Sequence, residues 1–564
     1  MSAPPPSSAD APASLSSRVD ALASRNQSLE SMLAELTQAH ERLQAEQAAR
    51  DDAHAAQIRQ MQSVMESQAQ EIQRSKPANA GNPTTSNVAT DAVTAVAAPT
   101  SAASAASAPS AAATQPGATG PSVPLRHPGS SPSVPPSSAV GPQPLASADP
   151  AVSLLVDLPS LLPELESLYK SLHAHPELSM QETRTAEIAA KHLRQHGYEV
   201  STGVGKTGVV GLLRNGEGAT VMLRADMDAL PVREATGVDY ASTVTATDAD
   251  GHSVPVSHAC GHDFHVTWLA GASALFARHR DAWRGTLLVV FQPGEETAQG
   301  AQAMMRDGMM QRFPKPDVVL GQHVMVLPAG TVAGSAGPIT SAADSLQIRL
   351  FGRGAHGSMP QASCDPIVMA AAIVLRLQTI VSREVAASEA AVLTVGVLQA
   401  GSAANVIPSE ALIQLNMRTF DEGVRTHILE AITRIVNAEA QASGAPKLPE
   451  ITTIDRYPLN VNDQVASERV AAAMRGHFGA DRVSHTDPAP ASEDFGCFGT
   501  EWDAPSVYWF VGGTDPQVYA QAKADGCLNA LPVNHSPHFL PVLHPTLRTG
   551  VEAMVAGAAA WLAK

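Results

Sequence analysis

At 564 residues the chain is too long for a single hydrophobic core, and its formal net charge of −17 argues against nucleic acid or an anionic membrane as a partner. Its four cysteines are far apart in the sequence, which is not a disulfide framework and favours a reduced, cytoplasmic compartment. We expect no secretory signal and no membrane span, because the N-terminus lacks a basic region followed by an apolar core and no run of about 18 apolar residues occurs.

The first 75 residues divide into two parts. Residues 1–13 are rich in Pro, Ser and Ala, and we expect them to be disordered. In residues 14–75 leucines recur every seven positions from Leu15 to Leu43. A second set of heptad positions lies four residues after each leucine, and Asn26 is a polar residue of that set. This pattern is typical of a parallel two-stranded coiled coil, which would let the chain self-associate. A single solvated helix is the alternative.

Residues 76–150 are built almost wholly from Ala, Ser, Pro, Thr and Gly. Such a segment cannot bury enough apolar area to offset the entropy lost on ordering. We therefore predict a disordered linker between the coiled coil and the globular part of the chain.

Residues 151–340 predict the first part of an α/β domain. Apolar strands end in polar residues at TVMLRADMDAL (220–230), GTLLVVFQPGEE (285–296) and DVVLGQH (317–323). Strands that alternate with helices indicate a mostly parallel sheet with both faces covered. In such sheets ligands bind beyond the carboxyl ends of the strands, where these polar residues lie.

Residues 341–453 have a different pattern. Strand, helix, strand, strand, helix and a last strand follow one another, which predicts a small antiparallel α+β domain of ferredoxin-like type. We expect it to be inserted into the larger domain, which resumes over residues 454–564.

The stretch SHACGHDFHVT (257–267) is the densest set of candidate ligands. Gly261 between Cys260 and His262 lets the backbone turn tightly. Since alternate residues of an extended segment point the same way, the two side chains would converge on one metal ion. A turn whose histidines make ordinary hydrogen bonds is the alternative. Further candidates are the adjacent Glu295 and Glu296, His323 at a strand end, and either His535 or His538.

Eight motifs occur in order between residues 172 and 540: LHAHPELSMQE, LRADMDALPV, SHACGHDFH, VVFQPGEE, GRGAHGSMP, NVIPSEALIQLNMRTFD, ASEDF and NHSPHF. Together they resemble the M20 metallopeptidase family, and in particular its amidohydrolase branch that acts on N-acyl amino acids, such as hippurate hydrolases and hydrolases of indole-acetyl amino acids. The resemblance does not extend to residues 1–150.

The resemblance implies a site for two divalent metal ions, Mn²⁺ or Zn²⁺, with Co²⁺ or Ni²⁺ as further options. The implied metal ligands are Cys260, His262, Glu296, His323 and His535, with Cys260 in a bridging position. Glu295 would act as general base and then as general acid. Asp228 would orient an imidazole ligand.

The resemblance also implies that the small domain is a lid that forms a homodimer. His356 would stabilise the oxyanion, and Asn405 and Arg418 would bind the substrate carboxylate or shape the pocket. Each has a structural alternative, since His356 could cap a glycine turn and Arg418 could form a structural ion pair.

The expected activity is metal-dependent hydrolysis of the amide bond of a small N-acyl amino acid. Two alternatives remain open. One is a dipeptidase or carboxypeptidase of the same superfamily, and the other is a coiled-coil scaffold that carries a relic hydrolase domain.

Overall fold

The structure is a computed structural model that describes Asp149 and residues 151–564. The predicted disordered segment 1–13, the coiled coil 14–75 and the linker 76–150, apart from Asp149, lie outside the described residues. The carboxylate of Asp149 lies 2.7 Å from Nδ1 of His477, so the start of the described chain is held against helix α9 (Gln464–Phe478).

The larger of the two main sheets has eight strands and is mixed. Its strands, in spatial order, are β1 (Glu199–Val204), β2 (Gly208–Asn215), β6 (Gly285–Gln292), β3 (Thr220–Asp226), β7 (Val318–Pro328), β18 (Ser506–Thr514), β8 (Val332–Ala333) and β17 (Val483–Ser484). The pairs β6–β3, β3–β7, β7–β18 and β8–β17 are parallel, as predicted. The pairs β1–β2, β2–β6 and β18–β8 are antiparallel. The expected parallel arrangement thus holds at the centre, whereas the short turn between β1 and β2 permits only an antiparallel hairpin.

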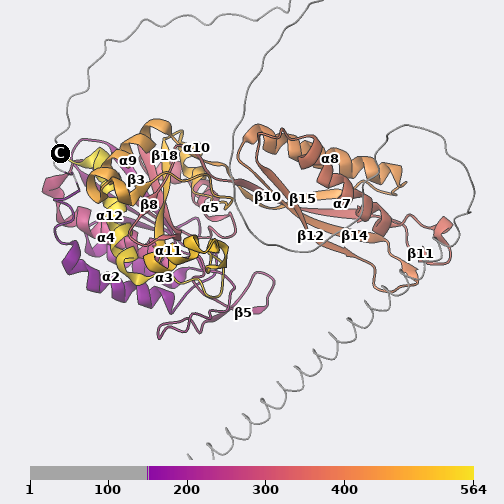
Figure 1. Ribbon diagram of the computed structural model, residues 1–564, viewed down its shortest axis with the longest axis horizontal. Coiled ribbons are helices and arrows are strands. Elements are labelled where there is room, and N and C mark those ends of the chain that lie inside the picture. Colours follow the sequence, from indigo (N-terminus) through magenta and orange to yellow (C-terminus); the bar gives the residue numbers. More distant parts are fainter. Residues whose placement is uncertain (1–148, 150) are drawn as a thin grey trace, which may run out of the picture. The chain divides into compact units, whose positions relative to one another are not determined.

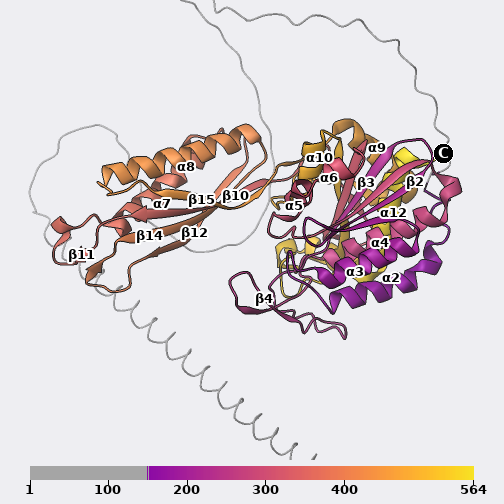
Figure 2. The ribbon, with the colours of Figure 1, turned by 180° about the vertical axis from the view of Figure 1, so that it is seen from behind.

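Helices cover both faces of this sheet (Figures 1 and 2). Strand β3 shows why, because Val221 and Leu223 pack into one apolar core and Met222 packs into the other. One face carries α2 (Leu158–His173), α3 (Thr183–Gln195), α4 (His262–Arg278), α9 and α12 (Leu543–Leu562). The opposite face carries α5 (Gly300–Arg306), α6 (Met309–Arg312) and α10 (Gly496–Trp502), and α11 (Pro516–Ala524) contacts β7.

The second main sheet is antiparallel and has four strands, in the order β12 (Ala391–Ala400), β14 (Glu410–Thr419), β10 (Ala342–Phe351) and β15 (Glu450–Tyr457). Helices α7 (Pro366–Arg383) and α8 (Glu422–Ala442) lie on one face of it (Figure 1). Their apolar sides form a separate core with the strands, around Ile348, Ile373 and Ile413. The chain order β10, α7, β12, β14, α8, β15 is the predicted ferredoxin-like pattern, and we call this part of the chain the lid domain.

Helix α7 begins where the sequence indicates. Asp365 caps it by accepting the backbone N–H of Ile367 at 2.8 Å, and Pro366 occupies the first turn. Among the described residues α7 is also the one helix whose length and composition would suit a membrane span. Its buried residues pack into the lid core, and this packing explains the apolar side of α7 that faces the sheet.

Short two-stranded ribbons complete the described elements: β4 (Thr245–Thr247) with β5 (Ser253–Pro255), β9 (Gly337–Thr340) with β16 (Asn460–Asn462), and β11 (Ala355–His356) with β13 (Val406–Ile407).

Candidate metal centre

The turn before α4 brings Cys260 and His262 together. Gly261 between them has a φ of 85°, and a Cβ at this position would overlap Val324, so glycine is required here. His262 is the first residue of α4. The two side chains therefore converge because the backbone turns, and the prediction that they alternate along an extended segment is wrong.

The other predicted ligands come from three separate parts of the chain. Glu296 follows β6, His323 lies on β7, and His535 precedes α12. The backbone N–H of His535 donates to the carbonyl of Ala259 at 2.7 Å, which holds that segment against the Cys260 turn. The site thus forms near the carboxyl ends of parallel strands, where ligands of α/β sheets bind.

Cys260 is shared by two groups of potential metal ligands. In one group its Sγ and the ligand atoms of His262 and His323 lie within 4.8 Å of one another. In the other group its Sγ lies within the same limit of Glu296 and His535. The Cys260 Sγ to His323 Nε2 distance is 3.4 Å, and His535 Nε2 lies 3.3 Å from Glu296 Oε2. One thiolate could therefore contact two neighbouring ions.

A hydrogen bond at His323 and close carboxylates at His262 hold these imidazoles with a ring nitrogen toward the centre. Nδ1 of His323 donates to the carbonyl of Val324 at 2.8 Å, which leaves Nε2 facing Cys260. Nδ1 of His262 lies 3.3 Å from Asp228 Oδ1, and Nε2 lies 3.7 Å from Glu296 Oε1. Asp228 is itself held by Ser179 at 2.6 Å and by the N–H of Glu296 at 3.0 Å. Asp228 lies where a carboxylate that orients a metal-binding histidine is expected.

Several buried polar atoms of this cluster have no hydrogen-bond partner among the described residues. They are both ring nitrogens of His262, Oε1 of Glu296 and Oδ1 of Asp228. Buried polar groups are normally paired, so a concentration of unpaired donor and acceptor atoms needs an explanation. Imidazole, carboxylate and thiolate groups form a donor set that suits Zn²⁺, and mixed N/O sites also take Mn²⁺. The residues present therefore fit two divalent ions.

The electrostatics of the cluster favour cations. Burial raises the pKa of Glu296 to about 8, and burial together with the charge of Glu296 raises the pKa of the Cys260 thiol well above its usual range. Burial opposes charge on His262, yet the neighbouring Asp226 and Asp228 hold its pKa well above the ordinary value. Protons and metal ions compete for such ligands, so metal binding here would release protons.

Glu295 lies beside these ligands. Its side chain is only 5% exposed, and burial with the charges of Glu493 and Glu296 raises its pKa well above the ordinary value. Tyr457 donates a hydrogen bond of 3.2 Å to the Glu295 backbone carbonyl. A carboxyl group with a raised pKa in a buried site is suited to accept and return a proton.

A buried ionic network, which the sequence analysis did not identify, supports the centre. Arg224 on β3 donates to Asp226 at 2.6 Å, Glu493 at 2.7 Å and Asp494 at 3.1 Å, and its Nε donates to Gln292 at 2.7 Å. Asp226 in turn lies 3.7 Å from Nδ1 of His262. The available signal was a charged residue within an otherwise apolar strand, which is unusual unless the charge is paired.

Two predicted lid residues, His356 and Asn405, lie together but not within the cluster of candidate ligands. Nδ1 of His356 bonds to Ser358 Oγ at 2.7 Å, and Asn405 accepts the N–H of Gly357 at 2.7 Å across the β11–β13 ribbon. In the described part of the chain, no hydrogen bond or ion pair joins His356 or Asn405 to the predicted metal ligands. Both side chains are exposed.

Arg418 on β14 donates to the carbonyl of Pro490 at 2.6 Å and to Ser492 at 3.3 Å. Partial burial of His535, whose side chain is 56% exposed, lowers its pKa, and the positive charges of His262 and Arg418 lower it further. Arg418 thus has a structural contact to the segment that precedes Glu493 and also acts electrostatically on a predicted ligand.

Two further histidines, in the motifs LHAHPELSMQE and NHSPHF, have structural partners. His173 bonds through Nδ1 to Asp263 at 2.6 Å and through Nε2 to Glu234 at 3.0 Å. His538 bonds to the carbonyl of Ala235 at 2.9 Å. A further group with metal-ligand spacing, Asp248, Asp250 and His252, lies on the surface turn between β4 and β5.

Comparisons with known proteins agree with this geometry. The sequence model of the peptidase family M20/M25/M40 matches residues 222–528. A hippurate hydrolase of Campylobacter jejuni is 36% identical over 352 residues, which are 62% of this chain and 88% of the relative. Thermostable carboxypeptidase 2 of Saccharolobus solfataricus is 34% identical over 66% of this chain and 88% of its own. An N-acyl-L-amino acid amidohydrolase of Geobacillus stearothermophilus is 39% identical over 49% and 72%, respectively.

Solved structures resemble the described fold as well. A Bacillus subtilis protein described as a dinuclear metal-binding peptidase of the M20 family superposes with a TM-score of 0.56 and 27% sequence identity. The match covers 71% of this chain and 98% of that one.

Proposed function

The chain belongs to the M20/M25/M40 peptidase family of hydrolases, and from this premise we propose that it cleaves the amide bond of N-acyl amino acids with two divalent metal ions. The products would be a carboxylic acid and a free amino acid. The observation that carries the proposal is the position of Cys260, which is shared by the His262–His323 and Glu296–His535 groups with Glu295 alongside.

Cys260, His262, Glu296, His323 and His535 would hold the metal ions, and Cys260 is the residue common to both ligand groups. When bound, the ions supply Lewis-acid activation of a water molecule and of the substrate carbonyl. The unpaired atoms of His262 and Glu296, and the crowding of buried acidic groups, support this assignment. Mn²⁺ and Zn²⁺ are the first candidates, and Co²⁺ and Ni²⁺ suit the same donors.

Glu295 would move the proton. Its carboxylate takes a proton from the attacking water and returns it to the amide nitrogen as the C–N bond breaks, so the amine leaves in a neutral form. The raised pKa of Glu295 supports this role, because a carboxylate with a higher pKa is a stronger base toward the attacking water and keeps the proton until it passes to the amide nitrogen.

We assign His356 to the oxyanion, and Asn405 and Arg418 to the substrate carboxylate or the pocket wall. The β11–β13 pairing supports a joint role for His356 and Asn405, since His356 lies on this ribbon and Asn405 directly precedes β13. A homodimer through the lid domain would let this ribbon serve the centre of a partner chain.

Exposed apolar side chains on the lid support such a dimer. Val368 and Leu375 on α7 are 65% and 73% exposed, and Val392 and Leu398 on the edge strand β12 are 55% and 52% exposed. An edge strand with apolar side chains is a ready surface for pairing with a second copy.

The experiment that tests the function is a substrate panel. We would incubate the purified chain with Mn²⁺ or Zn²⁺ and hippurate, N-acetyl amino acids or dipeptides, and quantify the amino acid released. Release from hippurate or acetyl amino acids is the expected result. Release from dipeptides alone would contradict the proposal and favour a dipeptidase.

A peptidase is the second candidate, and the similarity to a thermostable carboxypeptidase favours it. A coiled-coil scaffold with a relic hydrolase domain is a weaker alternative, because Glu295 and all five predicted ligands are retained. Absence of any hydrolysis across the panel, with metal bound, would favour that scaffold.

A further inference from the structure

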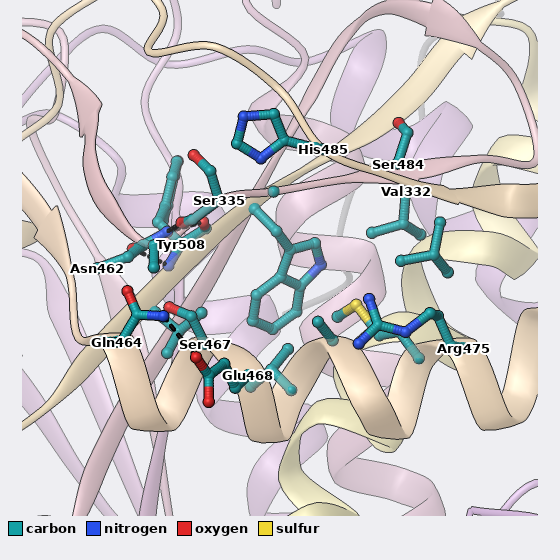
Figure 3. A pocket seen from close by; sticks show the side chains of 18 residues that line it. Val332, Ser335, Asn462, Gln464, Ser467, Glu468, Arg475, Ser484, His485 and Tyr508 are labelled. Carbon is teal, nitrogen blue, oxygen red and sulfur yellow. Dashed lines mark hydrogen bonds between the residues drawn. The ribbon is translucent and has the colours of Figure 1, made fainter. Parts of the chain in front are cut away.

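A cavity of about 450 Å³ lies between α9 and the β8–β17–β18 edge of the large sheet (Figure 3). None of the residues that line it is a predicted metal ligand. Its volume falls within the range of pockets that hold small molecules. The apolar part of its wall is formed by Val332, Val470, Met474, Val507 and Trp509.

Two serines in the lining have unsatisfied hydroxyl groups. Ser467 on α9 is only 8% exposed, and its Oγ has no hydrogen-bond partner among the described residues. The Oγ of Ser335 is likewise buried and without a partner. Because buried hydroxyls are normally paired, these two are available to a ligand group that enters the cavity.

The charged groups of the lining are separated along α9. Figure 3 shows Ser467 and Glu468 toward one end of this helix and Arg475 toward the other. The side chain of Arg475 has no ionic or hydrogen-bond partner in the described part of the chain, whereas Glu468 accepts from Gln464 at 2.5 Å. Glu468 and Arg475 are seven positions apart on the helix, which is about 10 Å along the axis.

We propose that this cavity is a second binding site, for a small monocarboxylate with an apolar body. The carboxylate contacts Arg475, and the apolar body packs on Trp509 and its neighbours. Glu468 disfavours a second carboxylate at the far end, where Ser467 instead offers a hydrogen bond.

Calorimetric titration of the metal-loaded enzyme with hexanoate tests the site. Hexanoate should bind, and Arg475→Gln should weaken its binding by about tenfold or more, since a charged hydrogen bond is lost. The neutral hexanamide and the dicarboxylate adipate should both bind the wild-type protein more weakly than hexanoate. Arg376→Gln is a matched control, because Arg376 is an exposed arginine of α7 outside the cavity lining.

A second variant separates this cavity from the metal centre. Ala471 lines the cavity, and Ala471→Phe should fill it and abolish hexanoate binding, with melting temperature and hydrolysis measured alongside. Equal binding to wild type, Arg475→Gln and Ala471→Phe would place hexanoate elsewhere and overturn the proposal. No binding to the wild-type protein would overturn it too, and loss in Ala471→Phe alone would overturn the assignment of the carboxylate.

Discussion

The imidazole Nδ1 of His265 donates a hydrogen bond of 2.5 Å to the buried carboxylate of Asp226. The other ring nitrogen, Nε2, accepts the backbone N–H of Val324 at 3.0 Å. The carbonyl of Val324 in turn accepts from Nδ1 of His323 at 2.8 Å. This chain of hydrogen bonds requires a single neutral tautomer of His265, and it connects the Arg224 network to a predicted metal ligand.

We therefore expect His265→Phe to weaken metal binding by about 10-fold to 100-fold, because loss of a group that orients a ligand has effects of that size. Competition with a chelator, followed by metal analysis, measures the change. His175→Phe replaces an exposed histidine and should leave the affinity unaltered. Equal metal affinities in His265→Phe and wild type would mean that the chain of hydrogen bonds does not position His323.

Glu295→Gln should reduce hydrolysis by about 10²-fold to 10⁴-fold while the metal content stays unchanged, since the side chain would lose its proton-transfer role but keep its shape. Steady-state rates on the best substrate of the panel, together with metal analysis, measure both effects. The control is Glu217→Gln on an exposed turn. A variant that retained wild-type rates would refute the assigned proton transfer.

Cys260→Ser should lower the occupancy of both metal positions, because Cys260 lies in both ligand groups. Cys527→Ser, at a half-buried cysteine, should keep two ions per chain. Metal analysis after dialysis gives the stoichiometry directly. If Cys260→Ser still held two ions per chain at wild-type affinity, the thiolate would not be a shared ligand.

Chelation of the metal should abolish hydrolysis and lower the melting temperature, because ions that bind only the folded chain stabilise it. The buried acidic groups add to this effect, since their repulsion returns when the ions leave. Addition of Mn²⁺ or Zn²⁺ should restore both properties. Calorimetric melting curves with and without chelator test this, and an unchanged melting temperature would contradict it.

His192 should make stability depend on pH. Burial, aided by the charge of His196, lowers its pKa from 6.5 to about 4, and Nε2 donates to the carbonyl of Ala270 at 2.8 Å. The unfolded chain binds this proton below about pH 6.5 and the folded chain does not, so the contribution is complete above pH 6.5 and is lost as the pH falls toward 4. Between these two pKa values the free energy of unfolding should fall by at most about 1.4 kcal/mol for each pH unit.

Urea unfolding of wild type and His192→Gln at pH 7, 5.5 and 4.5 isolates this contribution, since all other titrating groups are common to both. The stability advantage of the wild type should shrink as the pH falls. A constant difference would show that the folded protein protonates His192 as readily as the unfolded chain does.

The double change Leu375→Glu and Val392→Glu should convert a lid-mediated dimer into monomers, because it places charges on two exposed apolar positions of α7 and β12. Sedimentation velocity reports the state. Leu448→Glu is the matched control, as Leu448 is 70% exposed on the same domain but lies in the turn before β15. Dimers that survive the double change would place the interface elsewhere.

Much of the fold could be predicted because its signals are local. The apolar strands with polar ends and the order of elements in the lid domain are properties of short segments, and the structure has both. The antiparallel edge of the large sheet was missed, since pairing direction depends on which strands meet and not on the pattern within each one.

The candidate site likewise combines residues that the sequence reveals with contacts that only the tertiary structure makes. Residue types and motif spacing marked Cys260, His262, Glu295, Glu296 and His323 as candidates, because thiols, imidazoles and paired carboxylates are recognisable in one dimension, whereas only the family resemblance favoured His535 over His538. Only the tertiary structure placed Cys260 between two ligand groups and linked Arg224 to Asp494, which is 270 residues away in the sequence. Contacts between such distant residues arise when strands and loops pack together, and no local pattern encodes which of them will meet.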